Sequence, residues 1–261
     1  MKKSFALRWA AAISALAALM ACRRPATVGT QVQATPPVAT PAAPLAGSPT
    51  ATTAPAAPAL QVPRATTAVA IEQHDDDQQW LRSVATEPFL QPDSSEAARP
   101  YSIARMLWDD EALYLSLYAA DQNIAADATP TDSPLWLGDA FDVRIQGDSP
   151  TAPVYAIDVA PNGALSDARI ASGGSPDRSW HSGARLSIDI DGSLNLAQGE
   201  DDEEWVAFVA IPWKSLELTP HAGLRLRTRI GRCDTLRDGQ RRCGQWGGAI
   251  DKLVGTVELA K

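Results

Sequence analysis

Tryptophan is the side chain best suited to binding chemistry in this sequence of 261 residues, which has eight of them but only four tyrosines and four phenylalanines. Trp136 and Trp246 each lie in a glycine-containing loop sequence, PLWLGD and CGQWGGA. An exposed indole can stack on the apolar C–H face of a sugar ring while nearby carboxylates and amides bind the hydroxyl groups. Such groups are close in the sequence, since Asp139 and Asp142 follow Trp136 and Gln245 precedes Trp246.

The same residues also have a structural interpretation. An indole beside a strand can belong to the core, and acids beside a strand can form turns or be solvated charges. For four other tryptophans, which lie in or next to strand-like segments or turns, we expect core positions: Trp80, Trp108, Trp205 and Trp213.

Signatures of catalysis are absent from the sequence, which has no G-x-S-x-G, H-E-x-x-H, phosphate-binding G-x-x-x-x-G-K-[ST] or C-x-x-C motif. His74, His181 and His221 lie far apart, each next to turn residues, and are expected to be solvated. A pair of carboxylates for glycoside hydrolysis is not marked by any pattern. We therefore expect a binding or structural protein rather than an enzyme.

No organic cofactor is expected. Three acidic runs, Asp75–Asp77, Trp108–Glu111 and Glu200–Glu204, could supply oxygen ligands to a structural calcium ion, but solvated charge in turns is the favoured explanation for each run. Met106 shares a strand face with Ala104 and Trp108, which indicates a core position and not a haem ligand.

The distribution of charge excludes nucleic acid as a partner. No acidic residue precedes Ile71, whereas six of the 23 bases do, so all 31 acids stand against the remaining 17 bases, a formal balance of −14. Nucleic-acid binding depends on lysine and arginine displacing the counterions of phosphates, and such an acidic segment does not provide them.

The first 22 residues are typical of an export signal. A basic start is followed by the apolar stretch WAAAISALAALMA, too short to span a bilayer comfortably, and by LMAC at Leu19–Cys22. This ending resembles a bacterial lipobox, which would make Cys22 the lipidated N-terminus of the mature chain. Arg23 in the following position is compatible with sorting to the outer membrane. The alternative is an ordinary signal peptide with an incidental cysteine.

Residues 23–66 contain nine of the chain's 20 prolines, are otherwise rich in alanine and threonine, and show no hydrophobic period. We expect a disordered, extended linker that separates a folded domain, residues 67–261, from the membrane. Cys233 and Cys243 remain as a pair in an exported chain, and the polar DTLRDGQRR between them has an Asp-Gly turn signal. A disulfide across a hairpin loop is the expected arrangement.

Alternation of apolar and polar residues predicts strands in the domain. The segments are Ala112–Ala120, Asp139–Gly147, Val154–Pro161, Arg185–Ile190, Glu203–Pro212 and Leu224–Arg232. Turn-forming residues bound them, and only a turn at WKSLEL departs from the β pattern. In LRLRTRI, the leucines, Thr228 and Ile230 should face inward and the arginines outward. The fold class is therefore all-β, an antiparallel sandwich with immunoglobulin-like or jelly-roll-like layers.

Several segments together resemble carbohydrate-binding module family 9. They are LWDDEALYLSLYAAD, LWLGDAFDVRI, YAIDVAPNGALSDAR, EEWVAFVAIPWKSLEL and the closing VGTVEL, so the resemblance extends from about Ile71 to Leu259. The opening IEQHDDDQQW is similar to the family's I-D-G-x-x-D-x-x-x-W start, with Gln73 in place of glycine. The resemblance implies a β-sandwich that clamps a sugar between two tryptophans.

Placed on this sequence, the family's W-x-x-D-x-x-E pattern implies that Trp136, Asp139 and Asp142 bind the sugar, with Gln245 and Trp246 from the late loop. Asp142 replaces the usual glutamate and is one methylene shorter, which shortens its reach to a hydroxyl group. We expect an envelope lipoprotein that presents a glycan-binding sandwich. The alternatives are an envelope structural or assembly protein that has lost sugar binding, and an accessory part of a glycoside-degrading system.

Overall fold

The computed structural model describes residues 59–72, 78–126, 135–196, 202–248 and 253–261, except for the side chain of Trp136. The predicted signal segment with Cys22 and most of the predicted linker lie outside these ranges. So do His74, Asp75–Asp77 and the start of Glu200–Glu204. Within the described ranges, no helix is long and apolar enough to cross a membrane.

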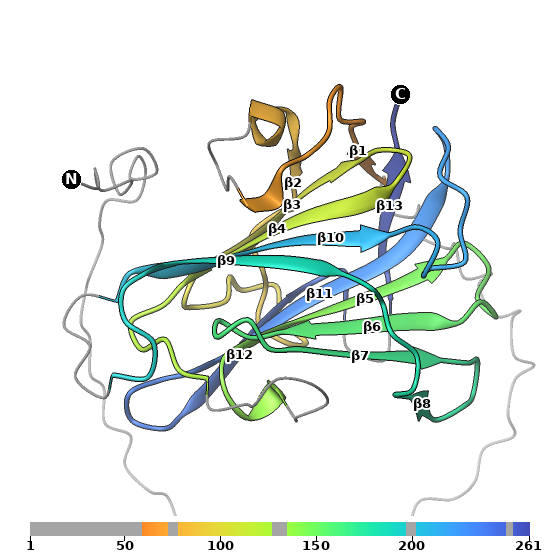
Figure 1. Cartoon of the computed structure of the whole chain (residues 1–261). Coiled ribbons are helices and arrows are strands. Elements are labelled where there is room, and N and C mark those ends of the chain that lie inside the picture. The colour runs from red at the N-terminus through yellow and green to blue at the C-terminus, as the bar shows by residue number, and fades with distance from the viewer. Residues whose placement is uncertain (1–58, 73–77, 127–134, 197–201, 249–252) are drawn as a thin grey trace, which may run out of the picture. The chain divides into compact units, whose positions relative to one another are not determined.

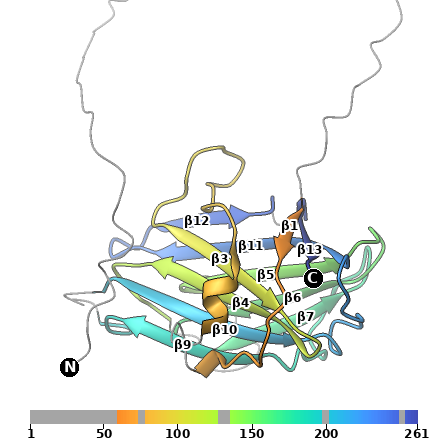
Figure 2. The same cartoon turned by 90° about the horizontal axis from the view of Figure 1, so that it is seen from above.

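Two sheets packed face to face make up the described part of the chain (Figure 1, Figure 2). The larger sheet has the order β1 (Leu60–Val62), β13 (Gly255–Leu259), β11 (Arg225–Thr235), β5 (Ala140–Gly147), β6 (Val154–Val159), β7 (Leu165–Ile170) and β8 (Pro176–Asp177), with β12 (Arg241–Trp246) also paired to β11. The smaller sheet has the order β2 (Val84–Ala85), β3 (Ser102–Trp108), β4 (Ala112–Ala120), β10 (Glu204–Pro212) and β9 (Arg185–Asp191). Two short 3-10 helices, η2 (Gln78–Arg82) and η3 (Leu135–Leu137), complete the elements.

This architecture confirms the predicted antiparallel sandwich. The predicted strand Ala112–Ala120 coincides with β4, and the other alternating segments contain or overlap β5, β6, β9, β10 and β11. A turn follows β10 at the predicted place, where the Ser215 N–H donates to the Pro212 carbonyl at 3.1 Å. Alternation is informative here because each sheet packs one face against the other sheet.

The main core lies between the sheets. Phe141, Val143 and Ile145 alternate along the inner face of β5, and Phe141 packs edge-on against Trp205 of β10 with 5.0 Å between ring centroids. The four tryptophans predicted to be structural are all buried, as is Met106: Trp80, Trp108, Trp205 and Trp213. Those indoles therefore stabilise the sandwich and are not available to a ligand.

The folded part begins earlier than predicted, which corrects the linker boundary at residue 66. β1 pairs in parallel with β13, placing Leu60 opposite Val257 and Val62 opposite Leu259. Val62 is fully buried in the main core. Three residues show no period of their own, and this strand depends on a partner almost 200 positions away, so local sequence could not reveal it.

A disulfide joins Cys233 of β11 to Cys243 of β12, directly opposite each other, as expected from the sequence. The hairpin between them closes at Asp238-Gly239, where Gly239 has a φ of 79°. The left-handed conformation suits glycine, and the Leu236 N–H donates to the Gln240 carbonyl at 2.8 Å. The disulfide therefore fixes β12 against β11, next to the residues described below.

Candidate functional site

Four residues lie side by side, in register, on neighbouring strands of the larger sheet, and we call them the outer-face line. Gly231 of β11 lies opposite Gln245 of β12 on one side and Asp142 of β5 on the other, and Asp142 lies opposite Asp158 of β6. Neighbouring residues in a strand point to opposite faces, so the core position of Phe141 places Asp142 on the outer face. Register therefore brings together two predicted site residues that are about 100 positions apart in the sequence.

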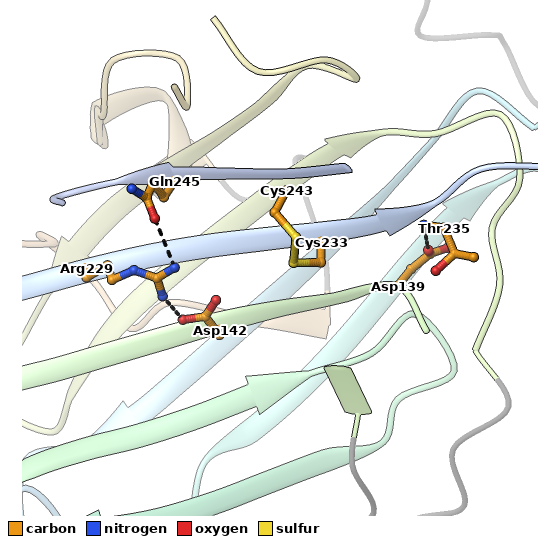
Figure 3. Close-up of a disulfide and its surroundings, with 7 residues drawn as sticks. All are labelled: Asp139, Asp142, Arg229, Cys233, Thr235, Cys243 and Gln245. Carbon is orange, nitrogen blue, oxygen red and sulfur yellow. Dashed lines mark hydrogen bonds and ion pairs between the residues drawn. A yellow bond between two sulfur atoms is a disulfide. The ribbon is translucent and has the colours of Figure 1, made fainter. Parts of the chain in front are cut away.

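Arg229 joins these two residues. Its guanidinium forms an ion pair with Asp142, and its Nη2 donates to Gln245 Oε1 at 3.3 Å (Figure 3). Its Nε donates to the Gly248 carbonyl at 3.1 Å. We call Asp142, Arg229, Gly231 and Gln245 the Arg229 cluster.

Gly231 is what allows Arg229 to lie flat on the sheet. A Cβ atom at position 231 would lie 2.6 Å from Arg229 Nη2 and closer still to Asp142 Oδ2. The outward direction of Arg229 agrees with the alternation of LRLRTRI, but only 7% of its side chain is exposed, whereas Asp142 is 22% exposed. The guanidinium is thus held rigidly, and the carboxylate keeps an accessible edge.

A second ion pair continues the polar surface across β5 and β6. Arg144 Nη1 contacts Asp158 Oδ1 at 2.6 Å and lies 4.0 Å from Asp142 Oδ1. Burial raises the pKa of Asp158, and Arg144 opposes that increase. The cluster and this pair together contain two carboxylates and two guanidiniums, a surface with both acceptors and charged donors for hydroxyl groups.

Trp246 lies on the other face of β12 from Gln245. It is opposite Ile230, a fully buried core residue, and it packs half-buried against the main core. Its Cζ3 lies 3.0 Å from where a Cβ of Gly255 would be. The structure therefore separates Trp246 from the outer-face line, although the two residues are adjacent in sequence.

Trp136 belongs to η3, which leads into β5 through Gly138. The Gly138 N–H donates to the Leu135 carbonyl at 3.1 Å and closes this short turn. The direction of the indole lies outside the described side chains, so its role as a stacking surface stays a prediction.

Asp139 does not join the Arg229 cluster. It is fully buried, and its two carboxylate oxygens accept the N–H groups of Thr235 at 2.7 Å and Ala125 at 2.6 Å. Burial, together with the negative charge of Asp121, raises the pKa of Asp139 well above its usual range. Its place at the start of β5, away from Asp142, is visible in Figure 3. A buried carboxylate held in this way cannot reach a sugar on the outer face.

The described parts of the acidic runs serve local structure. Asp109 Oδ1 accepts the N–H groups of Glu111 at 2.8 Å and Ala112 at 2.9 Å, which closes the turn between β3 and β4. Asp202 accepts the N–H groups of Ser193 and Ile124. These contacts are those of turn and loop acceptors. His181 and His221 are exposed, as expected.

Sequence reasoning missed Arg229 as the centre of the cluster and Arg144 as its neighbour. The alternation of LRLRTRI did place Arg225, Arg227 and Arg229 on one outward face. It could not select Arg229, because that choice depends on Gly231 and on the register with β5 and β12.

No protein-family model and no curated protein sequence matches the chain. Solved structures do match. A family 9 carbohydrate-binding module from Caldicellulosiruptor kristjanssonii, in complex with cellotriose, superimposes with a TM-score of 0.53 at 14% identity, covering 78% of this chain and 94% of the module. The chain has the fold of a family 9 carbohydrate-binding module.

Two further structures agree with this fold. A candidate carbohydrate-binding protein from Bacteroides uniformis has a TM-score of 0.58 at 11% identity, covering 77% of this chain and 98% of its own. The glucose complex of a Caldicellulosiruptor kristjanssonii family 9 module has a TM-score of 0.52 at 13% identity, with 75% and 94% covered. The family 9 fold expected from the sequence motifs is thereby confirmed.

Proposed function

We propose that this protein is a non-catalytic glycan-binding module that holds a sugar on the outer face of the larger sheet, over the Arg229 cluster. The observation that carries the proposal is the Asp142–Arg229–Gln245 arrangement, in which strand register gathers an acid, a guanidinium and an amide on the outer face, with the acid and the amide partly exposed. The likeness to modules that hold cellotriose and glucose supports the same function.

Each member of the cluster has a distinct role in the proposal. The exposed edge of Asp142 accepts a hydrogen bond from a sugar hydroxyl, and the amide of Gln245 accepts or donates one. Arg229 keeps both side chains in place and presents its remaining N–H groups. Charged partners make such hydrogen bonds stronger than those between neutral groups.

We assign the stacking surface to Trp136, since η3 leads directly into the strand that carries Asp142. Trp246, half-buried against the core, then supports the late loop from below. An aromatic ring and a few fixed polar groups are the usual composition of a small-ligand site.

The test is quenching of tryptophan fluorescence in the purified full-length protein, titrated with glucose, xylose, cellobiose and xylan. A saturable change is expected, and Trp136→Ala and Gln245→Ala should each lower the affinity by about tenfold, equivalent to about 1.4 kcal/mol. Gln240→Ala, in the exposed hairpin turn on the same pair of strands, is the matched control and should bind like the natural protein. Folded protein without a response to any of the sugars would refute the proposal.

We further propose that lipid on Cys22 anchors the protein to the bacterial envelope, in the outer membrane, with the proline-rich segment as a spacer. The support is the lipobox-like LMAC and the acid-free composition up to residue 70. Mass spectrometry of the mature protein should find a diacylglyceryl group on Cys22, and the protein should fractionate with membranes. The Cys22→Ser variant should lose both properties, and a Cys22→Ser protein that still fractionates with membranes would contradict the anchor.

Two observations favour a second function, that of an envelope structural protein which has kept the fold without the sugar site. Asp142 is already neutralised by Arg229, and Trp246 packs against the core instead of standing free. If this second function is correct, the protein would bind no sugar in the titration above. In a pull-down from envelope extracts, the purified protein would instead retain a partner protein that binds its outer face. The Gln245→Ala variant should weaken that retention if the same surface is used.

A further inference from the structure

Strand β9 forms one edge of the smaller sheet, at the rim of the sandwich (Figure 2). It pairs with β10, and within the described part of the chain no strand pairs with its other side. Its sequence, RLSIDID, alternates polar residues with Leu186, Ile188 and Ile190. An edge with unpaired N–H and C=O groups can take up a strand from another molecule, so β9 is a candidate interaction surface.

The register of the smaller sheet determines which residues of β9 have their backbone groups on the free side. In antiparallel strands, the backbone groups of successive residues point alternately to the two neighbouring strands. The Trp213 N–H donates to the Glu111 carbonyl at 3.1 Å, and these two residues continue the register of β10 with β4. Odd-numbered residues of β10 therefore bond to β4, and its even-numbered residues bond to the odd-numbered residues of β9 opposite them. The backbone groups of Leu186, Ile188 and Ile190 are left on the free side.

The side chains of the same three residues are apolar and only half-buried. They pack against the main core and, with Leu194 and the turn at residues 161–163 between β6 and β7, line an open groove of about 570 Å³. The two sheets are therefore not closed over each other at this edge. A free strand edge beside exposed apolar side chains is a typical surface for pairing with another strand.

The sequence of β9 is complementary to itself in one antiparallel register. With Ile188 opposite Ile188 of a second copy, Leu186 lies opposite Ile190, and all of these positions are ones whose backbone groups are free to exchange hydrogen bonds. In the intervening pairs, whose side chains lie closest, Arg185 faces Asp191 and Ser187 faces Asp189. Each cross-strand pair in this register is thus apolar with apolar, opposite in charge, or a hydroxyl group with a carboxylate.

Neighbouring registers fit less well. A shift that centres the pairing on Asp189 places that residue against its own copy, and like charges directly opposite each other are destabilising. A shift that centres it on Ser187 leaves Ile190 and Asp191 beyond the end of the partner strand. The side chain of Arg185 is exposed, with one ion pair to Glu72 at 3.3 Å, and is accessible to a second molecule.

We propose that this protein forms a symmetric dimer through β9, in which the two smaller sheets join into one continuous sheet around a two-fold axis at Ile188. Such an interface is isologous, because the same residues contribute from both copies. A single pair of short strands is a small interface, so association should be reversible and depend on protein concentration in the micromolar range. The Arg229 cluster lies on the outer face of the other sheet and stays accessible in the dimer.

Analytical ultracentrifugation of the purified full-length protein, from low to high micromolar concentration, tests the proposal. The average mass should rise with concentration from that of the monomer to twice that value. Arg185→Asp and Asp191→Arg each place like charges opposite each other twice in the dimer, so each should raise its dissociation constant by about tenfold. The double variant, Arg185→Asp with Asp191→Arg, recreates both opposite-charge pairs and should dimerise like the natural protein.

The matched control is Asp148→Arg, which makes the same change of charge in the exposed turn between β5 and β6 and should not alter dimerisation. Far-ultraviolet circular dichroism and the melting temperature confirm that each variant is folded. None of these readouts involves sugar, so their outcome is independent of the proposed glycan site.

Three results would overturn the proposal. A natural protein that stays monomeric at every concentration refutes the dimer, and slow amide hydrogen exchange at Leu186, Ile188 and Ile190 in that monomer would show that another segment of this chain covers the edge. A dimer that neither single reversal weakens uses another surface. A double variant that remains as weak as the single variants contradicts the register centred on Ile188.

Discussion

Replacing Gly231 with alanine should dismantle the Arg229 cluster while leaving the sandwich folded. The new Cβ would lie 2.6 Å from Arg229 Nη2, closer than such atoms approach in folded proteins, and 3.0 Å from Arg229 Cζ, which is a tight contact. The guanidinium must then move, losing its contacts with Asp142 and Gln245. Overpacking of this kind costs about 1–3 kcal/mol.

For a domain of this size, a loss of about 2 kcal/mol lowers the melting temperature by about 4–8 °C. Gly147→Ala is the matched control, because Gly147 also lies in the larger sheet and its added Cβ would make only ordinary contacts, at 3.7 Å from Ala152 and Leu218. Calorimetry should find the control unchanged or slightly stabilised, and sugar titration should find that only Gly231→Ala has lost binding. If Gly231→Ala melts and binds like the natural protein, Arg229 is mobile and the cluster is not the rigid site described above.

The remaining predictions concern what holds the sandwich together. Replacing Cys233 and Cys243 with serine opens a loop between residues ten positions apart and should cost about 3 kcal/mol, measured by urea unfolding; an unchanged midpoint would show that the hairpin needs no clasp. Deleting residues 1–64 removes β1 with the buried Val62 and should lower the free energy of unfolding by about 2 kcal/mol or more, whereas deleting residues 1–53 should not change it. Equal melting temperatures of the two truncated proteins would instead support the predicted linker that ends at residue 66. Trp205→Ala should cost about 3–5 kcal/mol by the same unfolding assay, because the indole fills the main core beside Phe141; a smaller loss would mean that this part of the core repacks.

Much of the sandwich could be predicted because the alternation of apolar and polar residues within a short segment indicates a strand. Ala112–Ala120 alternates without interruption between two turns, and it is β4 in the structure. Cys233 and Cys243 flank a turn signal and do form a disulfide. Trp108 and Trp205 lie inside strand patterns, and both are buried as predicted. In each case the physical cause lies within about ten residues of the feature.

The site depended on distant parts of the chain and was predicted less well. Gln245 and Trp246 are adjacent, yet the period of the strand sends them to opposite faces. Asp139 and Asp142 are three residues apart, yet Asp139 is buried at the end of the core and Asp142 is partly exposed on the outer face. Arg229 acquires its role only through Gly231 and the register with two other strands.

The most direct test of the glycan-binding account is a crystal structure of the full-length protein soaked or co-crystallised with cellobiose. The account predicts a sugar ring on the outer face of the larger sheet, with hydroxyl groups within 3.2 Å of Asp142 or Gln245 carboxylate or amide atoms and the ring stacked on Trp136. A sugar bound anywhere else on the protein would contradict the proposed site. An outer face that stays free of sugar at saturating concentration would contradict the function.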